Sequence, residues 1–103
     1  MRWRPVAPIA DAELARPWLA VRVEGLTIVL ARLDDAWHAV EDRCTHAGCA
    51  FSEDATLEGA TIVCNCHGSE FDLRTGGLRR GPADAPVRAF AVRVAGDLLE
   101  VQL

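Results

Sequence analysis

The sequence has no apolar stretch long enough to cross a bilayer. The longest, at positions 26–31, is about six residues long, whereas a membrane-spanning helix needs about 20. The start of the chain also lacks the apolar core of an export signal, because Asp11 and Glu13 follow closely on the first arginines. We therefore expect a protein that is made and kept in the cytoplasm and that does not bind a membrane.

Basic clusters, low-complexity segments and internal repeats are also missing. The net charge is −4 at pH 7, and Arg79 and Arg80 form only an isolated basic pair. A nucleic-acid-binding protein would carry a basic stripe, so we expect no nucleic-acid partner. The 103 residues are enough for one domain, and a content of 50% hydrophobic and 25% charged residues is typical of a globular core.

Four cysteines in so short a chain need an explanation. A disulfide scaffold is common in small secreted proteins, but the missing export signal argues against secretion. In a reducing compartment, clustered cysteines and histidines more often bind a metal. The sequence therefore favours a metal site over a framework of structural disulfides.

Most of the chain has the pattern of short strands separated by turns. Apolar and β-branched residues alternate on either side of turn signals such as Gly25 and Gly96. In the segment before Gly96, the alternation predicts that Phe90, Val92 and Val94 share one face of a strand. The predicted strands are 18–23, 27–33, 37–40, 61–63, 88–94 and 98–103.

The cysteines and histidines concentrate in one part of the sequence. Positions 44–83 hold all four cysteines and two of the three histidines, and little of this part is strand-like. We therefore predict an all-β protein in which both ends of the chain, 1–43 and 84–103, form an antiparallel base. The metal-binding part is inserted between them. One short helical turn, capped by Asp11, is expected near the N-terminus, and no long helix anywhere.

The metal-binding residues fall into two groups, C-x-H at 44–46 and C-x-x-H at 64–67. Zinc fingers, c-type haem and thioredoxin-like sites need C-x-x-C spacings that are absent. A plant-type ferredoxin needs four thiolates in a C-x-x-x-x-C-x-x-C run, of which Cys44 and Cys49 fit only the first step. The pattern instead fits a 2Fe–2S cluster in which two cysteines hold one iron and two histidines hold the other. The predicted ligands are Cys44, His46, Cys64 and His67.

This mixed ligand set has a consequence for redox chemistry. Two ferric ions, two sulfides and two thiolates sum to zero charge, whereas four thiolates would leave the oxidised cluster a dianion. Adding an electron to a neutral cluster costs less free energy than adding it to a dianion. Reduction potentials of such clusters accordingly lie at about −150 to +300 mV, against about −400 mV for plant-type ferredoxins. We therefore predict a one-electron carrier that holds one 2Fe–2S cluster.

At these residues the sequence resembles the Rieske iron–sulfur family. Positions 44–49 and 64–69 are similar to that family's two cluster-binding loops, 71–76 to the strand and turn after the second loop, and 81–82 to the proline loop that covers the cluster. The resemblance implies an antiparallel β-sandwich base with an inserted cluster-binding subdomain at 44–83. It also implies that the histidine-ligated iron lies near the tip of the protein.

The size of the chain resembles that of the soluble Rieske ferredoxins of ring-hydroxylating oxygenase systems. This resemblance implies a protein that is not itself an enzyme and that passes electrons from a flavin-dependent reductase to a terminal oxygenase. Two redox alternatives remain, namely a small Rieske-like subunit of a nitrite reductase and the soluble part of a bc-type Rieske subunit. A zinc-binding interaction module is the non-redox alternative.

Further residues near the loops take their expected roles from the same resemblance. Cys49 and Cys66 match the pair that forms a disulfide in the high-potential members of the family. Ser69 matches the residue whose hydroxyl donates to a bridging sulfide there, and such hydrogen bonds raise the reduction potential. Phe71 departs from that type, which usually has a tyrosine at this position. The other residues expected to shape or cover the site are Gly48, Gly68 and Pro82.

Residues outside the two motifs are expected to be structural. His38 lies in a predicted strand and is expected to be a surface or sheet histidine. The acidic residues Glu53, Asp54 and Glu58 are expected to form a solvated loop. A docking surface for basic residues of a partner is the alternative for these carboxylates.

Overall fold

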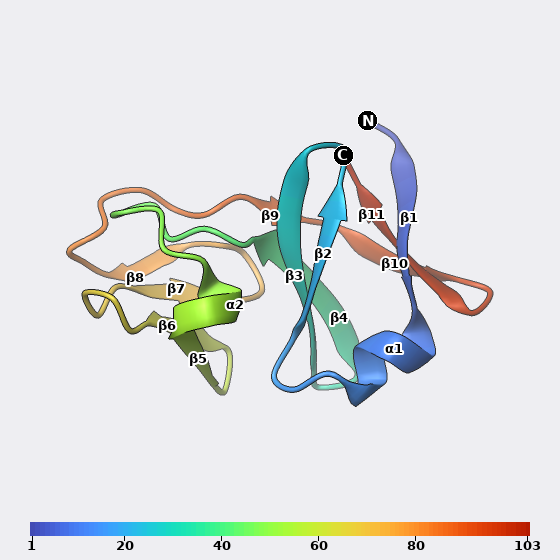
Figure 1. Ribbon diagram of the computed structural model, residues 1–103, viewed down its shortest axis with the longest axis horizontal. Helices are drawn as coiled ribbons and strands as arrows, with labels where there is room; N and C mark the ends of the chain where they lie inside the picture. The colour runs from blue at the N-terminus through green and yellow to red at the C-terminus, as the bar shows by residue number, and fades with distance from the viewer.

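The computed structural model describes residues 1–103, and antiparallel strands with only two short helices make up its regular structure (Figure 1). The prediction of an all-β fold is therefore confirmed. Neither helix has the length and apolar character needed to cross a membrane. The elements in chain order are β1 (Trp3–Pro8), α1 (Ile9–Leu14), β2 (Leu19–Val23), β3 (Leu26–Leu33), β4 (Ala36–Glu41), α2 (Phe51–Asp54), β5 (Ala55–Glu58), β6 (Thr61–Cys64), β7 (Glu70–Asp72), β8 (Leu78–Arg80), β9 (Ala89–Phe90), β10 (Val92–Ala95) and β11 (Leu98–Gln102).

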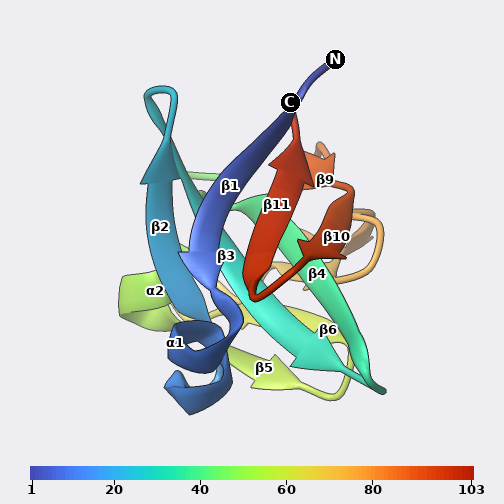
Figure 2. The same cartoon turned by 90° about the vertical axis from the view of Figure 1, so that its right-hand side faces the viewer.

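Two antiparallel sheets, which we call the base sheets, pack around a common core (Figure 2). One has the strand order β1-β11-β10 and the other β2-β3-β4-β9. Their shared core contains Ile28 and Leu30 from β3, and Leu99 and Val101 from β11, all fully buried. Strands from both ends of the chain thus meet in these two sheets.

A third sheet, which we call the insert sheet, has the strand order β5-β6-β7-β8 and lies with α2 at the other end of the molecule (Figure 1). Its core contains Phe51 of α2 and Phe71 of β7, whose rings are 5.6 Å apart, together with Ile62 of β6. Strand β3 serves both cores, because successive side chains of a strand point to opposite faces. Val29 and Ala31 face the core of the insert sheet, so positions 28–31 are apolar without interruption.

The single strand predicted at 88–94 is wrong, because the chain changes sheet at Ala91. Phe90 in β9 pairs with β4, whereas Val92 and Val94 in β10 pair with β11. This crossing breaks the alternation of faces. Phe90 is buried in the core of the base, but the side chain of Val94 is 55% exposed.

The prediction of Asp11 as an N-cap is also wrong. Helix α1 begins at Ile9, directly after extended Pro8, so Asp11 lies in its first turn. No side chain caps this helix. A carboxylate in the first turn still interacts favourably with the positive end of the helix dipole.

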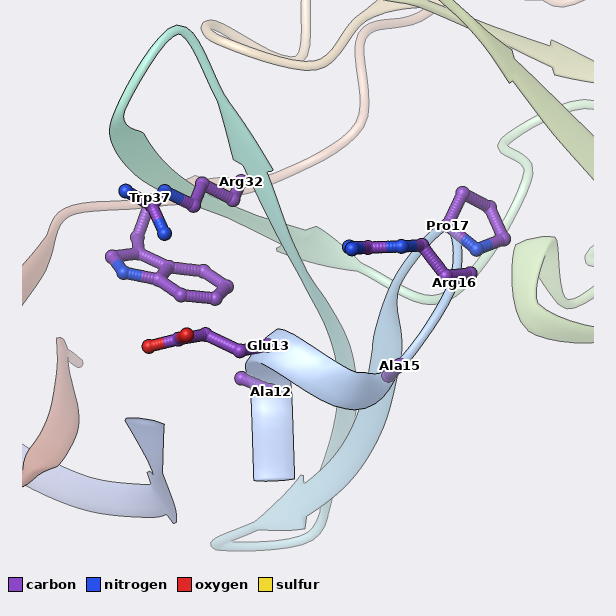
Figure 3. Close-up of a pocket in the computed structure, with 7 residues that line it drawn as sticks. All are labelled: Ala12, Glu13, Ala15, Arg16, Pro17, Arg32 and Trp37. Carbon is purple, nitrogen blue, oxygen red and sulfur yellow. The ribbon is translucent and has the colours of Figure 1, made fainter. Parts of the chain in front are cut away.

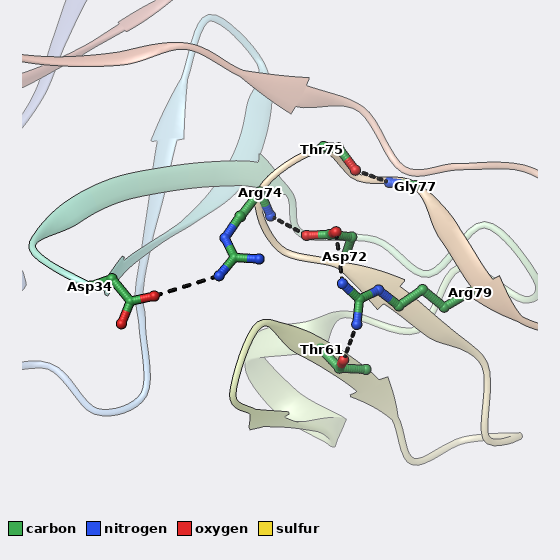
Figure 4. Close-up of polar contacts among 7 residues, drawn as sticks. All are labelled: Asp34, Thr61, Asp72, Arg74, Thr75, Gly77 and Arg79. Carbon is green, nitrogen blue, oxygen red and sulfur yellow. Dashed lines mark hydrogen bonds and ion pairs between the residues drawn. The ribbon is translucent and has the colours of Figure 1, made fainter.

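A chain of polar contacts joins the insert sheet to the base (Figure 4). Arg74 donates to Asp34 in the β3–β4 turn over 3.5 Å, and its backbone amide donates to Asp72 over 2.8 Å. Arg79 donates to Asp72 over 2.8 Å and to Thr61 over 2.7 Å. Asp72 therefore lies at the centre of the network and accepts from two different residues.

Asp72 gives the fold a dependence on pH. Its carboxyl pKa lies below the usual range, chiefly because Arg79 donates a hydrogen bond to it. The ionised carboxylate then stabilises the fold above the unfolded pKa of about 3.9, and this contribution is lost as the pH falls through the folded value. We expect Asp72→Asn to lower the midpoint of urea unfolding at pH 7 and to change it less at pH 3.

The matched control for this variant is Asp35→Asn, because the Asp35 carboxylate is almost fully exposed and pairs only with Arg32. Exposed pairs of this kind contribute little to stability, so the control should shift the midpoint slightly at both pH values. Equal destabilisation by Asp72→Asn at pH 7 and pH 3 would show that the ionised form of Asp72 makes no special contribution.

Candidate metal centre

The two predicted ligand loops, which we call the first loop (44–49) and the second loop (64–69), have the same backbone hydrogen bonds. In the first loop, Cys44 donates to the carbonyl of Cys49 and accepts from the amide of Gly48, both over 2.8 Å. In the second, Cys64 makes the equivalent bonds with Ser69 and Gly68, again over 2.8 Å. Two similar closed turns therefore hold the predicted ligands.

Gly48 and Gly68 occupy the same place in these turns, with φ of +78° and +87°. This left-handed backbone region is one that glycine adopts without strain. A common C-x-x-x-G spacing at 44–48 and 64–68 is the sequence signal for it. Both glycines therefore let the two turns close in the same way.

The two predicted histidine ligands face one another at the exposed tip of the loops. The Nδ1 atoms of His46 and His67 are 3.2 Å apart, and the rings meet edge to face with their centroids 4.7 Å apart. One metal ion about 2.1 Å from each nitrogen would see the two at an angle of about 100°, which is close to tetrahedral. The imidazole pair therefore fits the histidine-ligated iron of the predicted cluster.

The two cysteines that remain unpaired, Cys44 and Cys64, are buried. Burial raises the pKa of the Cys64 thiol, and the adjacent Cys44 raises it further. The backbone amides of Cys66 and His67 point at the Cys64 sulfur and act in the opposite direction. Two buried thiolates need a positive charge between them, which is the setting that a thiolate-bound iron supplies.

The other two cysteines, Cys49 and Cys66, are joined by a disulfide. It links the first loop to the second, and the two Cα atoms are 6.8 Å apart. The Cys66 sulfur also lies 3.3 Å from a carboxylate oxygen of Asp54. The structure thus pairs the two cysteines that the sequence assigns to a disulfide, and it adds a carboxylate contact that the sequence does not reveal.

A segment at 81–86, which we call the strap, is fastened to both loops. The amide of Ala83 donates to the Ser69 hydroxyl over 3.0 Å, and the Thr45 hydroxyl donates to the carbonyl of Ala85 over 2.7 Å. Pro82 belongs to this strap. Ser69 is fully buried, and its hydroxyl proton has no acceptor among the hydrogen bonds of the protein. A donor left free in this position fits a sulfur acceptor of the predicted cluster.

The family model of the Rieske [2Fe-2S] domain matches residues 2–91. This chain belongs to the Rieske family. The ferredoxin component of the p-cumate 2,3-dioxygenase system of Pseudomonas putida is 30% identical over 95 residues, which cover 92% of this chain and 78% of that protein. The family resemblance seen in the sequence is therefore confirmed, and the domain description implies a 2Fe–2S cluster.

Two solved structures are similar to this Rieske protein. One is a complex of reduced oxygenase and oxidized ferredoxin in carbazole 1,9a-dioxygenase. Its matched chain is 32% identical to this protein, with a TM-score of 0.82, and the match covers 96% of this chain and 91% of the matched chain. The other is a ferredoxin of carbazole 1,9a-dioxygenase from Nocardioides aromaticivorans, with 27% identity and a TM-score of 0.86, covering 98% and 97%. The relatives are ferredoxin components of dioxygenase systems, which are electron-transfer proteins and not the catalytic oxygenases.

The remaining residues singled out in the sequence of this Rieske protein lie around the site. Phe71 is fully buried against Phe51, so it is a core residue beneath the loops. Of the three acidic residues expected in a solvated loop, two lie in α2 and the third in β5. All three are exposed, so the expected solvation holds and the expected loop does not. His38 is half-buried in β4, and burial lowers its pKa.

One cavity of about 200 Å³ lies in the base, away from the two loops (Figure 3). It is bounded by α1, the residues that follow it, and β3 and β4. The charged and aromatic side chains at its edge are Glu13, Arg16, Arg32 and Trp37. None of the predicted metal ligands contributes to it, so the candidate site of this Rieske protein is the pair of loops and not this cavity.

Proposed function

We propose that Cys44, His46, Cys64 and His67 hold one 2Fe–2S cluster and that the protein is a cytoplasmic one-electron carrier. It accepts electrons from a flavin-dependent reductase and delivers them to the terminal oxygenase of a ring-hydroxylating dioxygenase system. The observation that carries this proposal is the pair of facing imidazole nitrogens in the same two loops that hold two buried, unpaired cysteines. The ferredoxin relatives support the choice of an oxygenase system.

The residues of this chain divide the work between them. When bound, the cluster takes up and releases a single electron. The two cysteines are buried, so their thiolates are shielded from water and from oxidants. The two histidines are exposed, so a partner docked on the tip approaches the imidazoles directly. The strap is held against both loops by Thr45 and Ser69.

We propose the following role for positions 44–83. They act as the cluster-binding subdomain, while 1–43 and 84–103 act as a rigid base. The shared strand β3 and the Asp34–Arg74 contact support a fixed relation between the two parts. A fixed relation keeps the ligand loops in place when the protein binds a partner.

A second candidate function is favoured by two observations. The Cys49–Cys66 disulfide and the free donor of Ser69 are features of the high-potential members of the family. They favour a carrier in a bc-like or other high-potential chain. Phe71 favours the low-potential type, because it has no hydroxyl to donate to a ligand sulfur. The reduction potential separates these two candidates.

Anaerobic titration with dithionite tests the proposed function. We expect the purified brown protein to take up one electron per chain, with bleaching of its visible absorption, and to contain iron and acid-labile sulfide in equal amounts. Uptake of two electrons, or a colourless protein that contains zinc, would contradict the proposal, because Zn²⁺ has no accessible redox state.

Ser69→Ala is expected to lower the reduction potential, and Phe71→Tyr to raise it. A hydrogen bond to sulfur that strengthens by about 1.4 kcal/mol on reduction shifts a one-electron potential by about 59 mV. Ser69→Ala also removes the acceptor of the Ala83 amide, which should cost about 1–3 kcal/mol of stability. Protein-film voltammetry and urea unfolding measure the two effects.

Ser52→Ala is the control for the serine variant. Ser52 also lies in the inserted part, but its hydroxyl bonds Asp42 and not the strap. We expect this control to lose some stability and to keep its potential. If Ser69→Ala and Phe71→Tyr both keep the reduction potential of the parent protein, as the control does, then neither Ser69 nor position 71 acts on the cluster.

A further inference from the structure

A second group of sulfur atoms lies next to the predicted cluster ligands. The sulfurs of Cys49, Cys64 and Cys66 all lie within 4.8 Å of one another. Asp54 adds an oxygen 3.3 Å from the Cys66 sulfur. Three thiolates and one carboxylate are the donors of a tetrahedral site for a soft divalent cation. Two of these three sulfurs, those of Cys49 and Cys66, are bonded to each other in the disulfide.

We propose that reduction of the Cys49–Cys66 disulfide opens a zinc site made of Cys49, Cys64, Cys66 and Asp54. Two equivalents of an external thiol reduce the bond, giving two cysteine thiols and one external disulfide. In the protein without a cluster, Zn²⁺ then displaces three thiol protons and binds three thiolates and the carboxylate. Where Cys64 is bound to iron, only the two new thiols lose protons, and Zn²⁺ takes the Cys64 thiolate from the iron. The site and the cluster exclude one another, because both require Cys64.

The distances in the structure fit such a site. Sulfurs bound about 2.3 Å from one zinc ion at tetrahedral angles lie about 3.8 Å apart. The three sulfurs all lie within 4.8 Å of one another, so the bonded pair has to separate while the Cys64 sulfur is already close to the other two. The Cα atoms of that pair are 6.8 Å apart, at the wide end of the range for disulfides, which leaves room for the separation.

The framework of the site does not depend on the disulfide. The Cys44 amide bonds the Cys49 carbonyl over 2.8 Å, which closes the first loop by itself. The amide of Asn65 donates to the carbonyl of Asp54 over 2.9 Å, so the backbone of Asp54 is fixed to the second loop. Reduction therefore leaves both loops closed and Asp54 in place beside Cys66.

The disulfide then has a role in metal selection. While the bond is intact, the donors available at the loops are the two cysteines and two histidines of the proposed iron site. After reduction, a site with three thiolates competes for Cys64 and favours zinc over a histidine-ligated iron. This part of the inference rests on the proposed function, whereas the zinc site itself does not.

The test uses the full-length protein as purified, with and without anaerobic treatment with a phosphine reductant. Zn²⁺ is then added, and native mass spectrometry gives the bound metal while the visible spectrum reports the cluster. We expect one zinc per chain and loss of the cluster absorption only after reduction. Cd²⁺ in place of Zn²⁺ should give a thiolate charge-transfer band with the intensity of three thiolates.

Variants identify the ligands. Cys49→Ser should abolish the reduction-dependent gain of zinc. Asp54→Asn should weaken zinc binding by more than the roughly 10- to 100-fold that loss of a supporting residue costs, because Asp54 is itself a ligand of this site. Glu53→Gln, at the adjacent exposed carboxylate of α2, is the matched control and should bind zinc as the parent does. His46→Asn should also bind zinc after reduction, because its imidazole is not a ligand of this site.

Two results would overturn the zinc site. One is equal zinc binding with the disulfide intact. The other is zinc binding that survives in Cys49→Ser and is lost in His46→Asn, which would place the ion on the histidine-containing ligands. Failure of the proposed function would be a separate result. A protein that contains no iron before reduction would contradict the proposed function, whether or not it binds zinc after reduction.

Discussion

His46→Ala is expected to yield a colourless protein that keeps its secondary structure but does not hold the cluster. Removal of a residue that only supports a metal ligand already costs about 10- to 100-fold in metal affinity, so removal of a ligand itself should cost more. His46 shares its ion with His67 across 3.2 Å in our assignment. Visible absorption and iron per chain measure the effect, and circular dichroism reports the fold.

His38→Ala is the matched control, because His38 is the one histidine outside both loops. It lies half-buried in β4, outside the ligand loops, and burial lowers its pKa. We expect this variant to keep its colour and its iron. A His46→Ala protein as brown as the control would contradict the ligand assignment.

Gly76→Ala is expected to cost more stability than any other single glycine-to-alanine change in the chain. Gly76 has φ of +75°, and a Cβ there would lie 2.1 Å from the backbone carbonyl oxygen of Val87. The Val87 amide also donates to the Gly76 carbonyl over 2.9 Å, so the two backbones are held together. We expect a loss of more than about 4 kcal/mol in urea unfolding followed by tryptophan fluorescence.

Gly25→Ala separates the clash from the backbone strain. Gly25 has φ of +82°, similar to that of Gly76, but a Cβ there meets no atom within 4 Å. This control should lose only about 1–2 kcal/mol, the cost of a left-handed conformation for an alanine. Similar losses in both variants would show that the close approach of Gly76 and Val87 has no energetic consequence. A large loss at Gly76 alone would show that Val87, directly after the strap, is fixed to the β7–β8 turn.

The candidate site is recognisable in the sequence because each of its two pairs of proposed ligands lies within one short loop. Cys44 and His46 are two positions apart, as are Gly48 and His46, so the spacing alone indicates a loop with a thiolate and an imidazole. The strap contact could not be predicted in this way. Thr45 and Ala85 are separated by 40 positions, and only the tertiary fold brings them within 2.7 Å.

Strands were predictable where the alternation of side chains reflects one sheet and failed where the chain changes sheets. The segment around Val94 alternates as cleanly as a single strand, but pairing with two different partners decides where it ends. The Asp54 contact with Cys66 was likewise hidden, because helix α2 is too short to show an apolar period. In both cases long-range packing determines the outcome and local pattern does not.

The reduction potential tests the central claim most directly. Protein-film voltammetry from pH 6 to pH 10 on the freshly purified brown protein should give a value near −150 mV, almost independent of pH around neutrality, as expected for a Rieske donor to an oxygenase. A potential above about +100 mV would contradict this function and assign the protein to a high-potential chain, in which Ser69 and the disulfide outweigh Phe71.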